Sequence, residues 1–429
     1  MQGHFSRLLG LLELEHEEEL RQNKIELTRL AAGVRESLGR SVTRLTAEEA
    51  GAAEGERPLL AFSRAEAGEE LSPFHAMNRG DLVCAESPTG QRLDGTIYEI
   101  GPYRASVAMS APPPQPLPRG GRWTLHLVGS DATYRRMRRA IEDVERAEKK
   151  PVARLREVSF GRLKAGVEKR GEPHFFDRAL NEFQRQAVVR ALSGKDFALV
   201  HGPPGTGKTR VLVEVIRQAA KAGERVLATA PSNVAVDNLL ERLLGTGLRV
   251  VRMGHPARTA PSLRHATLDA QLSEHPDAKK IRELDRARER LMVQRSRRAD
   301  RGQLGYDERH ERQREIRELW REARGLEKAL TREVLGGAQI VLATHGSIGS
   351  TVSREAFDLA VLDEASQAVE PLSWLPLLLA KRAVLAGDPL QLPPTLHSEK
   401  AAKEGLELTL FERLQQTLPE SLQSLLRIQ

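Results

Sequence analysis

The residues with the clearest chemical meaning are eight consecutive positions near the middle of the chain. They lie between a short apolar run, 197–201, and a stretch with helical spacing, 211–220. A glycine-rich turn between a strand and a helix lets several backbone N–H groups point at one anion, and the helix N-terminus adds partial positive charge. The lysine can reach the terminal phosphates of a nucleotide, and the threonine hydroxyl can ligate Mg²⁺. We therefore predict a phosphate-binding loop, rather than a plain glycine turn, formed by Gly202, Pro203, Pro204, Gly205, Thr206, Gly207, Lys208 and Thr209.

An acidic pair, Asp363 and Glu364, follows another apolar run. An aspartate at a strand end can hold Mg²⁺ through the water shell of the ion, so Thr209 and Asp363 are the predicted metal ligands. The neighbouring glutamate can orient and deprotonate a water that attacks the γ-phosphate. The acidic pair is separated from Thr209 by about 150 residues, and a charged insertion of roughly 60 residues explains that distance.

Two glutamines have settings that suggest contact with a nucleotide. Gln391 follows a third apolar run, where a neutral amide could sense bound versus hydrolysed γ-phosphate; a proline-rich turn is the alternative. Gln184 precedes the glycine-rich loop by about 18 residues. An amide offers one donor and one acceptor, which matches the N6 and N7 edge of adenine and favours ATP over GTP.

Polar residues at two other strand ends are candidates for nucleic-acid contacts. They are Pro231, Ser232 and Asn233 after one apolar run and Thr344 at the end of another. Hydroxyl, amide and backbone N–H groups can hold a phosphodiester chain without reading its bases. The alternative for Ser232 and Asn233 is that they cap the following helix.

These candidate residues all sit beside predicted strands that alternate with helices. Such alternation indicates an α/β fold with a parallel, doubly wound sheet. The nucleotide domain is expected to begin near residue 179 and to be interrupted by a charged helical arm at 274–333, which could clamp nucleic acid or merely present solvated faces. The strands are expected at 197–201, 225–230, 248–253, 338–344, 357–364 and 382–388.

The N-terminal third has a different character. We predict a helix over 1–40, a small β-barrel over 41–130, and a helix with a linker over 131–178. Small barrels often bind nucleic acid, although most barrels of this size are scaffolds.

The composition limits the class of protein. Hydrophobic residues make up 40% of the 429 positions, and the formal net charge is +7, a balance that favours a polyanionic partner. A single cysteine, Cys84, excludes an internal disulfide. The sequence has no apolar run near the roughly 20 residues of a membrane span and no signal-like N-terminus, so we expect a cytoplasmic protein with no membrane partner.

Taken together, the motifs resemble those of superfamily 1 helicases, in the branch that includes the nonsense-mediated-decay and immunoglobulin-mu-binding-protein helicases. The chain looks like the N-terminal half of a bacterial relative. The similarity is weakest in the β region and the charged arm. The matching stretches are 180–184, 202–209, 230–237, 253–258, 363–367 and 385–395.

The resemblance implies a RecA-like ATP-binding domain over 179–429, with the N-terminal helix and residues 131–150 forming a stalk for the barrel. Members of this family hydrolyse ATP with Mg²⁺ and move 5′→3′ along single-stranded DNA or RNA. By that likeness Lys208, Thr209, Asp363, Glu364 and Gln391 would be the catalytic residues, in the roles given above.

The family pattern continues beyond position 429 with a second RecA-like domain, which we expect to be absent here. That domain supplies arginines to the γ-phosphate, and such an arginine is worth about 10³–10⁵ in rate in related enzymes. The chain is therefore expected to bind ATP and nucleic acid but to turn over poorly unless a second domain or a partner chain completes the cleft. A non-catalytic binding module is the alternative, and an AAA+ ATPase is a remote one. The sequence does not distinguish DNA from RNA.

Overall fold

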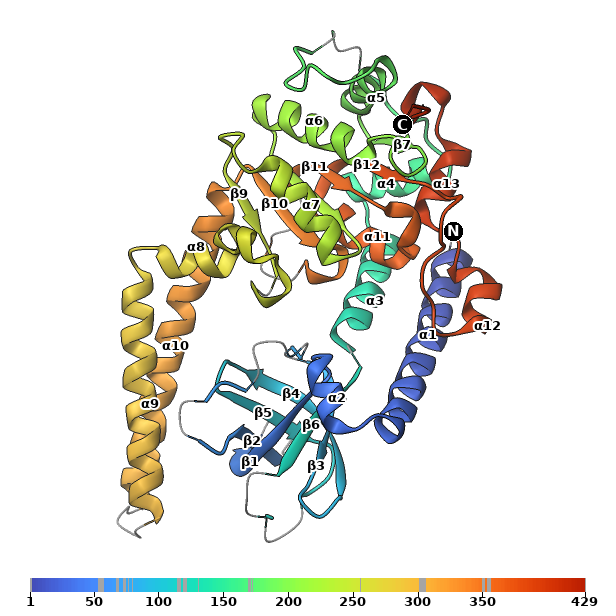
Figure 1. Ribbon diagram of the computed structural model, residues 1–429. Helices are drawn as coiled ribbons and strands as arrows, with labels where there is room; N and C mark the ends of the chain where they lie inside the picture. The colour runs from blue at the N-terminus through green and yellow to red at the C-terminus, as the bar shows by residue number, and fades with distance from the viewer. Residues whose placement is uncertain are drawn as a thin grey trace. The chain divides into compact units, whose positions relative to one another are not determined.

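Figure 1 shows the computed structural model of the chain. It describes residues 2–52, 58–66, 69–71, 75, 77–78, 80–113, 117–118, 122–129, 131–168, 171, 173–254, 256–300, 306–348, 352 and 356–428. Contacts divide the chain into two compact units, each assembled from segments that are distant in sequence. Unit 1 comprises Met1–Arg156, Ser366–Leu375 and Pro389–Arg413, and unit 2 comprises Glu157–Ala365, Pro376–Asp388 and Leu414–Gln429.

Unit 2 is built on a seven-stranded sheet in which every neighbouring pair is parallel. Apart from the edge strand Gln423–Leu425, the strands are short, mostly apolar runs that are buried along most of their length, as expected when both faces of a parallel sheet are covered. Their order is β13-β7-β12-β11-β8-β10-β9. The strands are β7 (Phe197–His201), β8 (Val226–Ala230), β9 (Val250–Arg252), β10 (Ile340–Thr344), β11 (Phe357–Leu362), β12 (Ala380–Gly387) and β13 (Gln423–Leu425).

The register of the sheet brings the candidate loops to one edge. Thr344 pairs with Ala230, and Leu362 pairs with Thr229, so β8, β10 and β11 end at nearly the same level. Because parallel strands all point the same way, the loops that follow them leave from the same side.

Helices alternate with these strands, and α5, α6 and α7 bury apolar side chains in the core of unit 2. The phosphate-loop helix buries Val211, Leu212, Val215 and Ile216, each fully covered. The helices are α5 (Glu182–Ser193), α6 (Lys208–Lys221), α7 (Asn233–Leu243) and α8 (Leu268–Glu274), with 3₁₀ turns at Pro256–Arg258, Pro261–Ala266, His345–Ser347 and Ala365–Gln367.

The charged insertion forms two long helices, α9 (Ala278–Asp300) and α10 (Tyr306–Gly337), which lie side by side in Figure 1. Their outer positions are mostly charged, and the described ones are largely exposed. Residues 301–305, which join these helices in the sequence, lie outside the described residues.

Unit 1 contains a closed six-stranded antiparallel barrel with the strand order β1-β2-β5-β4-β3-β6. Its interior is filled by apolar side chains, among them Phe62 and Trp123, which meet edge to face with ring centroids 5.8 Å apart. Closure pairs both edges of the sheet and so leaves no open edge strand. The strands are β1 (Ser41–Ala52), β2 (Pro58–Arg64), β3 (Leu82–Glu86), β4 (Arg92–Ile100), β5 (Arg104–Met109) and β6 (Trp123–Gly129).

The expectation of one helix over residues 1–40 is wrong in detail. Helix α1 (Gln2–Arg29) ends, Ala31 takes an extended conformation, and α2 (Ala32–Ser37) follows. The break lets the buried Arg35 donate to Leu127 O on the barrel at 3.1 Å, a tertiary contact that a continuous helix would not make.

The rest of unit 1 packs around α1. Helix α3 (Asp131–Arg146) lies along α1, with the rings of His16 and Tyr134 4.2 Å apart. The remaining helical elements of the chain are α4 (Pro151–Ser159), α11 (Glu370–Leu377), α12 (Glu399–Ala401), a π-helical turn (Ala402–Leu406), α13 (Leu410–Thr417) and a 3₁₀ turn (Glu420–Leu422).

A buried ionic cluster joins three of these elements within unit 1. Glu370, 1% exposed, is contacted by Arg413 Nη2, by His4 Nε2 at 3.1 Å and by Trp374 Nε1 at 3.1 Å. The first residue of α11 is thereby tied to both α1 and α13.

Candidate nucleotide and nucleic-acid sites

The glycine-rich loop lies between β7 and α6, with glycine where the backbone requires it. Gly205 and Gly207 have φ values of 81° and 87°, in the left-handed region that favours glycine. A Cβ on Gly202 would lie 2.7 Å from Thr206 Oγ1, so the first glycine is needed for close packing. Gly207 is also the N-cap of α6, which places the positive end of the helix at the loop.

Lys208 is buried, and its ammonium group is held by the loop itself. Nζ donates to Gly202 O at 2.8 Å and approaches Pro203 O at 3.5 Å. The Thr206 hydroxyl donates to Pro203 O at 2.7 Å. These contacts close the loop around the Lys208 ammonium group, a cation that an anionic phosphate chain could take over from the carbonyls.

Thr209 and Asp363, the predicted metal ligands, meet in space. The Thr209 hydroxyl donates to Asp363 Oδ2 at 3.2 Å, although the two residues are 154 positions apart. A hydroxyl beside a carboxylate fits Mg²⁺, which takes few protein ligands and completes its shell with water and phosphate oxygens. Among the residues that the structure describes, no cluster of three or more His, Cys, Asp or Glu side chains could hold an ion without such help.

Burial and the neighbouring Glu364 carboxylate raise the pKa of Asp363 to about 6. A cation beside it would favour the ionised form.

Glu364 has a backbone conformation that is rare for its type. Its φ is 50°, one of three non-glycine residues described with positive φ, and its backbone N–H donates to Asp363 Oδ1 at 3.0 Å. Strain of this kind costs on the order of 1–3 kcal/mol and tends to occur where a side chain must be aimed.

Gln184 braces the loop in a way that the sequence reasoning missed. Its Oε1 accepts from Asn181 N at 3.0 Å in a capping box, and its Nε2 donates to Thr206 O at 3.0 Å. Both faces of the amide are therefore engaged by protein. Contact with adenine stays a prediction, since it requires this amide to exchange partners.

Gln391 follows β12 in a turn of unit 1. With Gln367, Leu390, Leu392 and Pro393 it lines a pocket of about 360 Å³. The neighbouring Leu390 side chain is 89% exposed. The role of Gln391 as a γ-phosphate sensor stays a prediction.

His201, the last residue of β7, was missed by the sequence reasoning. Its Nε2 lies 3.3 Å from Asp388 Oδ1, and its Nδ1 lies 3.4 Å from Gln415 Nε2. The carboxylate accepts from Nε2–H, so Nδ1 accepts from the amide. The pair ties the end of β7 to the end of β12 just before the glycine-rich loop, and a histidine directly before Gly202 was the available signal.

A buried histidine, His345, links β8 to the turn that follows β10. His345 is fully buried, its Nδ1 lies 2.9 Å from Thr229 Oγ1, and burial lowers its pKa to about 3. Thr229 O in turn accepts from the backbone N–H of Asp363 at 2.8 Å. Backbone and side-chain bonds thus run from the acidic loop toward the end of β10.

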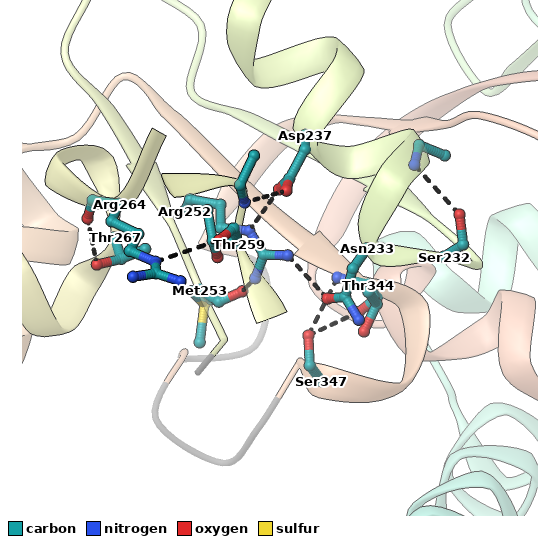
Figure 2. Close-up of polar contacts among 12 residues, drawn as sticks. Ser232, Asn233, Asp237, Arg252, Met253, Thr259, Arg264, Thr267, Thr344 and Ser347 are labelled. Carbon is teal, nitrogen blue, oxygen red and sulfur yellow. Dashed lines mark hydrogen bonds and ion pairs between the residues drawn. The ribbon is translucent and has the colours of Figure 1, made fainter. Parts of the chain in front are cut away.

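The four predicted nucleic-acid residues lie at the ends of the neighbouring strands β8 and β10. Figure 2 shows three of them, Ser232, Asn233 and Thr344. Ser232 is the N-cap of α7 and accepts from Ala235 N at 3.1 Å, as in the capping alternative. Asn233 accepts instead from Arg252 Nη2 at 2.8 Å. Thr344 forms a capping box with Ser347, and Pro231 joins β8 to α7. Contact of these four residues with nucleic acid stays a prediction; the bonds observed are a helix cap at Ser232 and an acceptor role for Asn233.

One exposed residue of this edge was also missed. Val234, in the first turn of α7, is 70% exposed. An apolar side chain beside the predicted phosphate-contacting groups would offer a surface on which a base could pack.

In the described part of the chain, each helix is too short or too polar to span a bilayer.

Comparison with known proteins places these sites in context. Residues 179–399 match a family model described as an AAA domain. The chain is 32% identical over 427 residues to the DNA-binding protein SMUBP-2 of Mus musculus, a match that covers 96% of this chain and 42% of that protein. It is 31% identical over 467 residues to an ATP-dependent helicase of Methanocaldococcus jannaschii, covering 99% of this chain and 67% of the relative.

A third relative matches over a shorter stretch. The regulator of nonsense transcripts 1 homolog of Arabidopsis thaliana is 36% identical over 240 residues, which cover 55% of this chain and 18% of that protein. The chain spans well under half the length of SMUBP-2.

Proposed function

This chain belongs to the superfamily 1 helicases of the type that includes SMUBP-2 and the regulator of nonsense transcripts, and on that premise we propose that it binds and hydrolyses ATP under the control of single-stranded nucleic acid. The observation that carries the proposal is the contact between Thr209 and Asp363. It joins the glycine-rich loop to the acidic loop at the edge of the sheet from which the β8 and β10 loops also leave.

In this proposal each side chain has a defined part in hydrolysis. Lys208 releases the carbonyl of Gly202 and donates to the β- and γ-phosphates, where it stabilises the charge that develops on transfer. Glu364 accepts the proton of the attacking water, held in line by the constrained backbone at its position. Mg²⁺, held through Thr209 and Asp363, would neutralise phosphate charge when bound. The fold of this domain is then a doubly wound, RecA-like ATP-binding domain.

The polymer along which the protein would move is single-stranded DNA or RNA. We infer that Ser232, Asn233 and Thr344 hold its backbone, because their N–H, hydroxyl and amide groups suit phosphate oxygens rather than base edges. Pro231, which has no N–H to donate, would shape the loop that presents them. Sustained movement along a strand would also require a second motor domain, or a partner chain, that closes over the nucleotide and supplies arginines to it.

The test is ATP hydrolysis by the 429-residue chain, with and without single-stranded DNA and RNA, beside Glu364→Gln. Stimulation by single strands that disappears in the variant supports the proposal. Clear nucleotide binding with turnover no faster than Glu364→Gln would instead mean that the chain is a binding module without catalysis.

A further inference from the structure

One buried charge of unit 2 has no part in the nucleotide site. Arg252, at the end of β9, is 0% exposed. A guanidinium removed from water is costly unless its donors are satisfied by well-placed acceptors. Here three acceptors surround it. Nε donates to Asp237 Oδ1 at 3.1 Å, Nη1 to Met253 O at 2.8 Å and Nη2 to Asn233 Oδ1 at 2.8 Å (Figure 2).

Two of these acceptors belong to the first turns of α7, and the contacts fix where that helix begins. Asn233 is its first residue, and Asp237 lies one turn later. The second oxygen of Asp237 accepts from Ala260 N at 2.8 Å, so the same carboxylate also holds the loop after β9. The N-terminal turn of α7 is therefore tied to β9 through a single arginine.

The arginine also decides which way the Asn233 amide faces. A guanidinium has only donors, so the group that meets it must be the amide oxygen and not the nitrogen. Within the described residues, no protein acceptor bonds to Asn233 Nδ2. The two amide N–H donors are thus turned away from Arg252, which is the correct polarity for a phosphate oxygen.

A neighbouring glycine makes room for this arrangement. Gly254 has φ +127°, and a Cβ built there would lie 2.3 Å from Arg252 Nη1. No side chain is compatible with the guanidinium at that place.

We propose that Arg252 is a positioning residue for nucleic-acid binding, which orients the Asn233 amide as a donor to a phosphate of a single strand. This inference rests on the proposed function. Arg252 itself is buried and does not touch the strand. It acts through Asn233, at the start of α7. The strand before α7, β8, pairs with β10, which ends at the Thr344–Ser347 turn.

The test measures binding of a fluorescent dT₂₀ oligonucleotide to the full chain by anisotropy. Arg252→Gln and Asn233→Ala should each weaken binding by about tenfold, the value of one good hydrogen bond to a charged group. Because both changes remove the same interaction, the double variant should bind dT₂₀ no more weakly than the weaker-binding of the two single variants. Arg242→Gln, an exposed arginine on the same helix, is the matched control and should change affinity by less than about twofold.

Asn233→Asp keeps the acceptor for Arg252 and replaces the outward donors with an acceptor. It should melt at or above the wild-type temperature and still bind dT₂₀ at least about tenfold more weakly. This variant keeps the inference testable if Arg252→Gln does not fold.

The outcomes separate the inference from the proposed function. Losses that add in the double variant, or normal binding by Asn233→Asp, would overturn the positioning role while the proposed function stands. A wild-type chain that fails to bind dT₂₀ at low salt would overturn both.

Discussion

The buried cluster at Glu370 yields a prediction whose size follows from the structure. The Glu370 carboxylate is 1% exposed, and Arg413, 9% exposed, is its cationic partner. Arg413→Met removes the guanidinium but keeps much of its apolar bulk, so a buried carboxylate loses its counter-charge. Breaking a buried pair in this way costs about 3–5 kcal/mol of unfolding free energy.

The reverse change supplies the check on this reasoning. Glu370→Gln alone leaves the Arg413 cation without its carboxylate and should cost a similar amount. The double variant Glu370→Gln with Arg413→Met has no buried charge at this place, so it should recover at least half of the summed losses. The amide oxygen introduced by Glu370→Gln could still accept from Trp374 Nε1, the contact that the native carboxylate makes at 3.1 Å.

Urea unfolding of the full chain, followed by tryptophan fluorescence, measures these effects, since Trp374 is fully buried beside Glu370. Lys403→Met is the control, because the ion pair of Lys403 with Glu399 lies in solvent and should contribute less than about 1 kcal/mol. A loss below about 1 kcal/mol in Arg413→Met, or strictly additive losses in the double variant, would refute the assignment of this pair as a buried, coupled unit.

Four further predictions follow from single features. Lys208→Ala should weaken binding of a fluorescent ATP analogue by at least about tenfold, because charge-assisted bonds to phosphate are lost; unchanged affinity would exclude the loop as the phosphate site. Gly207→Ala should also weaken binding of the ATP analogue, because a Cβ at this position, where φ is +87°, would lie 2.5 Å from Gln184 Nε2 and distort the loop. Burial, helped by the nearby Arg35 charge, lowers the pKa of His126 to about 4, so the unfolded chain binds more protons than the native chain between about pH 4 and 6.5. The free energy of unfolding should therefore rise with pH in this range, by up to about 1.4 kcal/mol per pH unit, and the slope should be shallower in His126→Gln. Burial raises the pKa of Cys84 to about 11, so iodoacetamide at pH 8 should alkylate it far more slowly in the native chain than in urea, and equal rates would contradict its burial.

Features encoded by adjacent residues could be predicted from the sequence. The glycine-rich loop, the strand before it and the helix after it are specified within about 25 residues, and the alternation of short apolar runs indicated the barrel and the α/β sheet. The meeting of Thr209 with Asp363 was predictable because both residues end or follow strands of one parallel sheet.

Features that depend on distant partners could not be predicted. The residues around Asn233 in the sequence do not indicate that Arg252 orients its amide. The break after α1 depends in the same way on a distant partner, since Arg35 contacts a carbonyl on β6. Gln184 was assigned to the base because its chemistry suits adenine, but the capping box and Thr206 O compete for the same amide. The observed bonds of Asn233, Arg35 and Gln184 all depend on tertiary partners, and contact of Gln184 with adenine stays a prediction.

The assembly of unit 1 from three separated segments has a consequence for how the chain is made. His4 contacts Glu370 and Arg413, which lie 366 and 409 positions later. At a synthesis rate of about 5–20 residues per second, the N-terminal helix waits roughly 20–80 s on the ribosome before its last partner emerges. The barrel, whose strands all lie within Ser41–Gly129, can close early in that interval. During translation the apolar face of α1, with Phe5, Leu8 and Leu12, is therefore a site where a chaperone would act.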